Sequence, residues 1–196
     1  MLILGINGSP RKGGNTDILL ERALTGAKAA GAETQRINLG ELRFSPCLSC
    51  ENARKDGVCK INDDMQKVSI AIAKADGIII ASPVYFGSVS AQIKMMIDRF
   101  QCYWAAIFMH KTLKNPPARP GAFICVAANS KKEFFENSKE VVKNLFFTLN
   151  VKYSKELLCA GVEGKGEVLK KTECLQKAEK VGFELVKKEG DDGCQI

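Results

Sequence analysis

Short apolar runs alternate with helical patterns along most of the chain, and this alternation limits the fold more than any other feature. The runs at 2–7, 76–82 and 121–128 hold almost no polar residue between their ends. Continuous apolar runs are typical of strands buried on both faces of a parallel sheet, because a half-buried strand would alternate polar and apolar residues. The sequence therefore predicts an α/β protein with helices on both faces of the sheet.

The predicted elements form one series along the chain, without an internal repeat or a linker. The predicted strands are 2–7, 33–39, 76–82, 121–128 and 151–159, and the predicted helices are 16–30, 62–74, 89–100, 130–149 and 167–188. A cysteine-rich loop at about 44–62 follows the second strand, and 101–119 is predicted to be irregular. Five such strands predict a flavodoxin-like, doubly wound parallel sheet in the order 2-1-3-4-5.

Composition and charge narrow the classes of function. The net charge is +7, but the lysines are spread along the whole chain and no basic run is interleaved with aromatic residues. We interpret this charge as favouring solubility and anionic cofactors, and we expect no nucleic-acid partner. The start of the chain shows no signal-peptide pattern and no run long enough for a membrane span, so we expect a cytoplasmic protein with no membrane partner.

The turn after the first strand has the pattern of an anion site. It reads GSPRKGGNT over 8–16, here called the phosphate loop, and the predicted helix follows it directly. Free amides and the helix dipole at such a turn attract an anion. A nucleotide-triphosphate loop would need lysine at position 14, which is glycine. A loop for a terminal monophosphate remains, and the alternative is a plain turn in which Asn15 or Thr16 caps the helix. The candidate phosphate ligands are Ser9, Arg11, Gly13, Asn15 and Thr16.

A second loop at the end of the third strand suits a flat heterocycle. This aromatic loop reads SPVYFG and comprises Ser82, Pro83, Val84, Tyr85, Phe86 and Gly87. Apolar and aromatic side chains can supply the walls of a ring site, and a glycine lets backbone approach the ring. In the predicted strand order this loop and the phosphate loop are neighbours at the switch point, where FMN binds in such sheets. We therefore predict that residues 1–196 form a single flavodoxin-like FMN-binding domain.

Two segments of the sequence resemble a known family. GSPRKGGNT and SPVYFGSVSAQIKMMIDRF together resemble the NAD(P)H-dependent FMN reductase branch of the flavodoxin-like superfamily. The resemblance extends from Met1 to about the last helix, and the first hundred residues carry most of its specific signal. It implies that four residues of the phosphate loop hold the FMN phosphate and that 83–87 hold the isoalloxazine ring. The loop after the fourth strand usually carries glycines in this family, and here 127–130 reads AANS.

Three of the eight cysteines, Cys47, Cys50 and Cys59, lie within thirteen positions. This segment resembles the compact motif of iron–sulfur flavoproteins, C-x2-C-x2-C with a fourth cysteine a few residues on. Ala53 stands where that motif has its third cysteine. A [4Fe–4S] cluster ordinarily uses four cysteine thiolates, so the replacement leaves one iron without a cysteine ligand from this motif.

Four interpretations of the cysteine-rich loop stay open at this point. The cluster is lost and the thiols are free, or three cysteines hold it while water, a small molecule, Glu51 or Asp56 takes the last iron. Zinc needs a fourth ligand, and the single histidine, His110, is distant in sequence. A Cys47–Cys50 disulfide is disfavoured in a reducing compartment. The cysteines predicted to be small core hydrophobes are Cys102, Cys125, Cys159 and Cys174.

The predicted function is that of an FMN-dependent oxidoreductase. NAD(P)H or another low-potential donor would supply electrons, and a small acceptor or a redox protein would receive them. One alternative, implied by the resemblance to iron–sulfur flavoproteins, is a ferredoxin-linked electron carrier with no nicotinamide site. Another is a flavin-binding regulator or scaffold. No catalytic side chain is predicted, and a single histidine gives little basis for a serine or cysteine hydrolase.

The segment FQCYWAAIFM at 100–109 is too apolar for a loop in water. Apolar surface of this kind usually marks an interface, so we expect an oligomer. Local packing beneath the edge of the sheet is the alternative. The resemblance implies a homodimer or a homotetramer.

Overall fold

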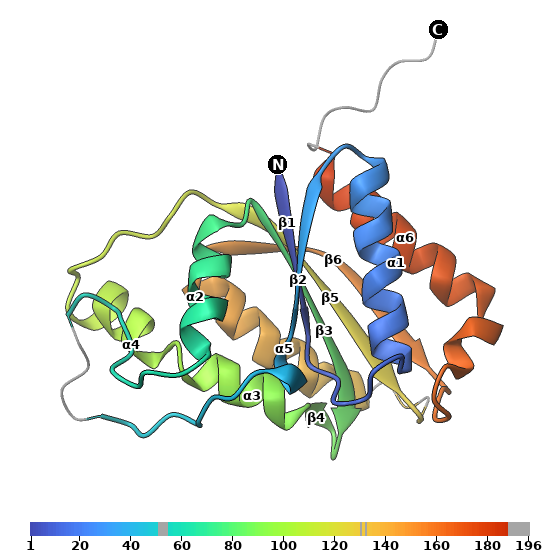
Figure 1. Cartoon of the computed structure of the whole chain (residues 1–196), viewed down its shortest axis with the longest axis horizontal. Helices are drawn as coiled ribbons and strands as arrows, with labels where there is room; N and C mark the ends of the chain where they lie inside the picture. Colours follow the sequence, from blue (N-terminus) through green and yellow to red (C-terminus); the bar gives the residue numbers. More distant parts are fainter. Residues whose placement is uncertain (51–54, 130, 132, 188–196) are drawn as a thin grey trace, which may run out of the picture.

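The computed structural model describes residues 1–50, 55–129, 131 and 133–187. Five parallel strands form the central sheet in the order β2-β1-β3-β5-β6 (Figure 1). They are β1 Leu2–Asn7, β2 Glu33–Asn38, β3 Gly77–Tyr85, β5 Arg119–Ala127 and β6 Val151–Ala160. The predicted doubly wound topology is confirmed, since β5 and β6 are the predicted fourth and fifth strands. Glu51, Ala53 and Ser130 lie outside the described residues.

Helices cover both faces of the sheet, as predicted (Figure 1). One face carries α1 Asn15–Ala29 and α6 Thr172–Val186, and the other carries α2 Met65–Lys74, α3 Ala91–Asp98 and α5 Glu133–Thr148. Short 3-10 helices occupy Leu39–Glu41 and Glu167–Lys170, so α6 begins five residues later than the predicted helix at 167. Among the described helices, none is long and apolar enough to cross a bilayer.

A short hairpin follows the third strand, where the sequence predicted a loop and then a helix. β3 continues to Tyr85 and pairs antiparallel with the two-residue strand β4, Ser88–Val89. The helix predicted at 89–100 therefore begins at Ala91. Ser90 is its N-cap, and the Ser90 Oγ accepts a hydrogen bond from the Ile93 amide at 3.4 Å.

The first part of the segment predicted to be irregular, 101–119, is helical. It forms the short helix α4, Gln101–Trp104, and a π-helix over Ala105–Met109. Within this segment Phe108 stacks on Phe147 of α5, with ring centroids 5.4 Å apart. Local packing thus covers part of the apolar surface of this segment, but Met109 remains 63% exposed. The oligomer interface stays a prediction.

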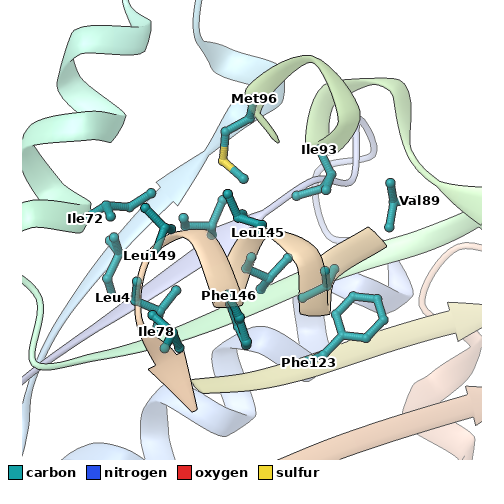
Figure 2. Packing of buried hydrophobic residues seen from close by; sticks show 14 of the residues in the cluster. Leu4, Ile72, Ile78, Val89, Ile93, Met96, Phe123, Leu145, Phe146 and Leu149 are labelled. Atoms are coloured by element: carbon teal, nitrogen blue, oxygen red, sulfur yellow. The ribbon is translucent and has the colours of Figure 1, made fainter. Parts of the chain in front are cut away.

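The larger of the two cores lies between the sheet and the helices α2, α3 and α5 (Figure 2). Strand residues such as Leu4, Ile78 and Phe123 meet Phe146 and Leu149 from the α5 side, and all five are 3% exposed or less. Each fully buried side chain of this size contributes about 1.5–3 kcal/mol to folding. This core fixes the strand ends from which both loops of the predicted cofactor site emerge.

The core on the opposite face contains two of the cysteines predicted to be buried. Cys159 is fully buried and its Sγ lies 2.7 Å from that of half-buried Cys174. Cys125, in the larger core, is also fully buried. Burial raises the pKa of Cys125 to about 12, so this thiol stays protonated at neutral pH.

Two glycines allow α1 and α6 to pack closely. A Cβ atom on Gly26 would lie 2.0 Å from the carbonyl oxygen of Glu179, and one on Gly182 would lie 1.7 Å from that of Ala23. No side chain can occupy these spaces without moving the backbone of the facing helix. This contact positions α1, whose N-terminus follows the phosphate loop.

We predict that Gly26→Ala destabilises the protein by about 1–3 kcal/mol, the usual cost of overpacking. Helix propensity alone would make alanine more stable than glycine here by about 1 kcal/mol. The sign of the change in the free energy of unfolding therefore tests the close packing directly. Urea denaturation measures the free energy of unfolding. The control is Lys180→Ala on the exposed surface of α6, expected within about 0.5 kcal/mol of the parent. A Gly26→Ala protein more stable than the parent would contradict the predicted clash.

Candidate cofactor sites

Hydrogen bonds connect the phosphate loop to the aromatic loop through Ala81 and Ser90, the residues on either side of the aromatic turn. The amide of Gly8 donates to the carbonyl of Ala81 at 2.8 Å, and the hydroxyl of Ser90 donates to the carbonyl of Gly8 at 2.7 Å. The Ser82 hydroxyl accepts from the Ser90 amide at 2.9 Å and donates to the carbonyl of Pro83 at 2.8 Å. Sequence reasoning missed Ser90, although serine directly before a helix is a common N-cap.

The start of α1 lacks a side-chain cap. Its N-cap residue is Gly14, which has no side chain to accept from the first turn. The alternative in which Asn15 or Thr16 caps the helix was therefore wrong. The first-turn amides lie beside two buried hydroxyl residues of the loop, Ser9 and Thr16, which are 8% and 2% exposed. Uncapped amides and hydroxyl groups at a helix N-terminus fit a phosphate group.

Two of the predicted phosphate ligands make contacts with the segment 163–168. The side-chain amide of Asn15 donates to the carbonyl of Gly164 at 2.9 Å, and its oxygen accepts from the Val168 amide at 3.1 Å. Arg11 donates from Nη1 to the carbonyl of Glu163 at 3.3 Å. Asn15 thus holds the phosphate loop against the segment 163–168, and its role as a phosphate ligand stays a prediction. Arg11 lies on the exposed side of the loop.

A neutralised carboxylate lies next to the phosphate loop. The amide of Gly13, which has a φ of 64°, donates to Asp17 at 2.6 Å, and Asp17 also accepts from the side chain of Asn7 at 3.0 Å. Arg36 forms an ion pair with Asp17. An unpaired carboxylate here would repel a phosphate, and the Arg36 guanidinium compensates for that charge.

The aromatic loop presents two side chains to solvent in a strained turn. Phe86 and Gly87 have φ angles of 50° and 72° and form the two-residue connection between β3 and β4. This is the pattern of a type I′ turn, which favours Asn-Gly, and a phenylalanine at positive φ costs about 1 kcal/mol. Phe86 is fully exposed and Tyr85 is 40% exposed. Strained backbone conformations are common at ligand-binding sites. Exposed aromatic side chains can stack on a flavin ring.

The cysteine-rich loop borders a cavity of about 650 Å³. Cys47, Cys50 and Cys59 line it from the loop, and Cys102 lines it from α4. The prediction that Cys102 is a core residue was wrong, because the helical turn at 101–104 places this half-buried thiol at the cavity. His110, which is exposed, also borders the cavity. Within the described ranges, no three His, Cys, Asp or Glu side chains converge closely enough to hold one metal ion.

A buried arginine holds this loop against α3. The Arg99 side chain is 1% exposed and donates to both oxygens of Asp63 at 2.7 and 3.1 Å. It also donates to the carbonyls of Ser45 and Ile61 at 2.8 and 3.3 Å, and from Nε to the Cys59 Sγ at 3.2 Å. Both ends of the loop are therefore fixed by one guanidinium. Sequence reasoning missed this role of Arg99 because its partners are distant in the chain.

Of the two acidic residues before α2, Asp63 pairs with this arginine and also binds the start of the helix. α2 begins at Met65, and Asp63 precedes it and accepts from the Met65 amide at 3.0 Å. Burial alone would raise the pKa of Asp63, but hydrogen bonds from Arg99 and from the amides of Ser45 and Met65 hold it below its ordinary value. Asp63 is therefore ionised at neutral pH and paired with Arg99.

The family of this chain follows from comparison of its sequence with known families. Residues 1–151 match the model of the NADPH-dependent FMN reductase family. The chain belongs to this family. The match includes the phosphate loop, the aromatic loop and the cysteine-rich loop, which confirms the resemblance on which the FMN site was predicted.

The curated relatives that the chain resembles include iron–sulfur flavoproteins. An iron–sulfur flavoprotein of Methanocaldococcus jannaschii is 46% identical over 99 residues, which are 50% of this chain and 51% of that protein. An iron–sulfur flavoprotein of Methanosarcina thermophila is 42% identical over 99 residues, 50% of this chain and 52% of that protein. The chain spans about half the length of the curated relatives that it matches.

Solved structures share the fold. A flavone reductase superposes with a TM-score of 0.75 at 21% identity, covering 95% of this chain and 62% of that one. An NAD(P)H:quinone oxidoreductase from Methanothermobacter marburgensis gives 0.71 at 16% identity, covering 94% and 98%. At these identities the likeness concerns the flavodoxin-like architecture alone.

We predict that Asp63→Asn destabilises the protein by about 3 kcal/mol at pH 7, because it leaves the Arg99 charge buried without its partner. The folded-state pKa of Asp63 is depressed, so its contribution is present above the unfolded pKa of about 4 and is lost as pH falls through the folded value. The difference between parent and variant should therefore shrink below pH 4. Urea denaturation at several pH values measures it.

The neighbouring variant Asp64→Asn serves as the control, since Asp64 pairs with the exposed Lys67 instead of a buried partner. We expect a smaller loss of stability from this variant than from Asp63→Asn. Equal losses in the two variants would mean that the Arg99 pair has no special role in holding the loop.

Proposed function

We propose that this chain is an FMN-dependent oxidoreductase that takes electrons from NAD(P)H and passes them to a small acceptor or a redox protein. The observation that carries the proposal is the hydrogen-bonded junction of the phosphate loop and the aromatic loop, in a chain of the FMN reductase family. When bound, FMN supplies the hydride and electron transfer chemistry. The protein supplies the binding site and its electrostatics.

In this proposal the phosphate loop binds the FMN phosphate through neutral donors and one cation. The first-turn amides of α1 and the hydroxyls of Ser9 and Thr16 donate hydrogen bonds to it, and exposed Arg11 adds a positive charge. Gly13 gives the loop its left-handed turn, and Asn15 holds the loop to the segment 163–168. Arg36 forms ion pairs with both Asp17 and Glu21 and so offsets part of the negative charge beside the loop.

The aromatic loop binds the isoalloxazine ring in the same proposal. Phe86 and Tyr85 provide the exposed aromatic surface, and Val84 packs against the large core behind them. Ser82 is fully buried, and its hydrogen bonds with Ser90 and Pro83 hold the loop in register with the phosphate loop. Pro83 and Gly87 shape the backbone, and the side chain of Asn137 donates to the Gly87 carbonyl at 2.9 Å. No side chain here is required as an acid or a base.

Anaerobic mixing with a reduced nicotinamide tests the proposal. The protein is loaded with FMN, freed of excess flavin, and mixed with NADPH or NADH while the flavin absorbance is followed. We expect rapid bleaching by at least one of the two donors. Failure of both, with bleaching by dithionite, would favour the alternative of an electron carrier with no nicotinamide site. A chain that retains no FMN would overturn both proposals.

We predict that Phe86→Asn raises the stability of the flavin-free protein and weakens FMN binding. Asparagine tolerates the positive φ at this position, which should recover about 1 kcal/mol. Loss of the aromatic face should weaken FMN binding about tenfold. Urea denaturation and fluorescence titration with FMN measure the two effects.

The control for this prediction is Lys111→Asn, which relieves a similar strain elsewhere. Lys111 is exposed and has a φ of 54°, but it lies outside both loops of the proposed FMN site. We expect a similar gain in stability with unchanged FMN affinity. An unchanged affinity in Phe86→Asn as well would remove Phe86 from the ring site.

A further inference from the structure

The cavity beside the cysteine-rich loop has no part in the proposed FMN site. Four thiols border it: Cys47, Cys50 and Cys59 from the loop, and Cys102 from α4. In the sequence Cys102 is more than forty positions from Cys59 and belongs to no motif. The helical segment after α3 brings this fourth thiol to the three others.

Arg99 links two of these sulfur atoms. Its Nε donates to the Cys59 Sγ at 3.2 Å, and the Cys102 Sγ lies 3.7 Å from its carbonyl oxygen. Cys47, Cys50, Cys59 and Cys102 line the same cavity, so the thiol from α4 shares that cavity with the three thiols of the loop.

We propose that Cys102 supplies the fourth thiolate of a [4Fe–4S] cluster held by Cys47, Cys50 and Cys59. In this arrangement it replaces the motif cysteine whose position Ala53 occupies. Each thiol would bind one iron as a thiolate and release its proton to solvent, and the iron and sulfide would come from cluster assembly. The proposal goes beyond the oxidoreductase function, and it does not depend on FMN binding.

The cavity suits a cluster in volume and in charge. Its thiols line about 650 Å³ instead of converging on one point, as the ligands of a single zinc ion must. A cluster with four thiolate ligands carries net negative charge, and the cavity offers the Arg99 hydrogen bond to sulfur together with Lys55 and Lys60. The side chains of Trp104 and Met109 form an apolar part of the wall.

Two other candidate ligands, Asp56 and His110, are less well placed than Cys102. Asp56 accepts a hydrogen bond from the Val58 amide at 3.0 Å and borders a different cavity, on the side of α2. His110 borders the same cavity, but a [4Fe–4S] cluster is ordinarily held by cysteine. His110 therefore provides a matched control within the site.

Quantification of iron and acid-labile sulfide after anaerobic reconstitution tests the proposal. The full chain is reconstituted with ferrous iron and sulfide, desalted and examined by absorption and, after dithionite reduction, by electron paramagnetic resonance. We expect about four irons and four sulfides per parent chain. Cys102→Ser should fall to the content of Cys59→Ser, less than half of the parent. His110→Ala and Cys174→Ser should keep the parent content.

Retention of the parent iron content and resonance spectrum by Cys102→Ser would overturn the proposal. So would one zinc per chain without labile sulfide, or a parent chain that takes up no iron. FMN retained by each variant reports an intact fold and keeps cluster loss distinct from failure of the flavin site.

Alkylation of the parent protein provides a second test that needs no variant at Cys102. Mass spectrometry after iodoacetamide treatment should show Cys102 protected, together with the three loop cysteines, in the reconstituted protein. A chelator should restore its reactivity. Equal alkylation of Cys102 before and after chelation would rule it out as a ligand, and Cys174 serves as the internal reference.

Discussion

The buried guanidinium of Arg99 is the interaction on which the candidate sites depend. A charge removed from water is costly unless acceptors replace the lost hydration. Here two carboxylate oxygens of Asp63, the carbonyls of Ser45 and Ile61, and the Cys59 sulfur all accept from it. A fully satisfied buried charge admits few alternative arrangements, so the loop between Ser45 and Asp63 is fixed at both ends.

Arg99 lies at the C-terminal end of α3, and the opposite end of the same helix lies beside the proposed flavin site. The N-cap residue Ser90 donates to the Gly8 carbonyl, and a Cβ on Gly8 would lie 2.2 Å from Cγ1 of Ile93. Eight residues of α3 span about 12 Å, so one short rigid element sets the separation of the proposed flavin and cluster sites. A displacement of α3 would change both sites together.

The main architecture could be predicted because it depends on local patterns. Apolar runs marked three of the five parallel strands, β1, β3 and β5, and the predicted strand order placed the phosphate loop beside the aromatic loop. The β3–β4 hairpin was missed because its turn uses Phe86-Gly87, which lacks the usual Asn-Gly signal. The helical conformation of 101–109 was missed because a segment that is apolar on all sides has no helical period to detect.

The site residues that sequence reasoning missed depend on contacts between distant parts of the chain. The Arg99–Asp63 pair joins residues 36 positions apart, and neither residue type indicates its partner. The same applies to Cys102, whose place at the cavity depends on where the helical segment after α3 packs. A single cysteine in an apolar stretch is typical of a core residue. Only the folded arrangement distinguishes a core cysteine from one that lines the cavity.

The contacts that hold the ends of the cysteine-rich loop also bear on how a metal centre would assemble. Ligands on a disordered loop must lose conformational freedom when they bind, and that cost lowers affinity. Here Arg99 fixes the loop ends and contacts the Cys59 sulfur, while Cys102 lies on a helix. Two of the four proposed thiols are thus positioned by protein contacts. The entropic cost of ordering therefore falls mainly on Cys47 and Cys50. These two cysteines are three positions apart, so bringing them together closes only a short loop.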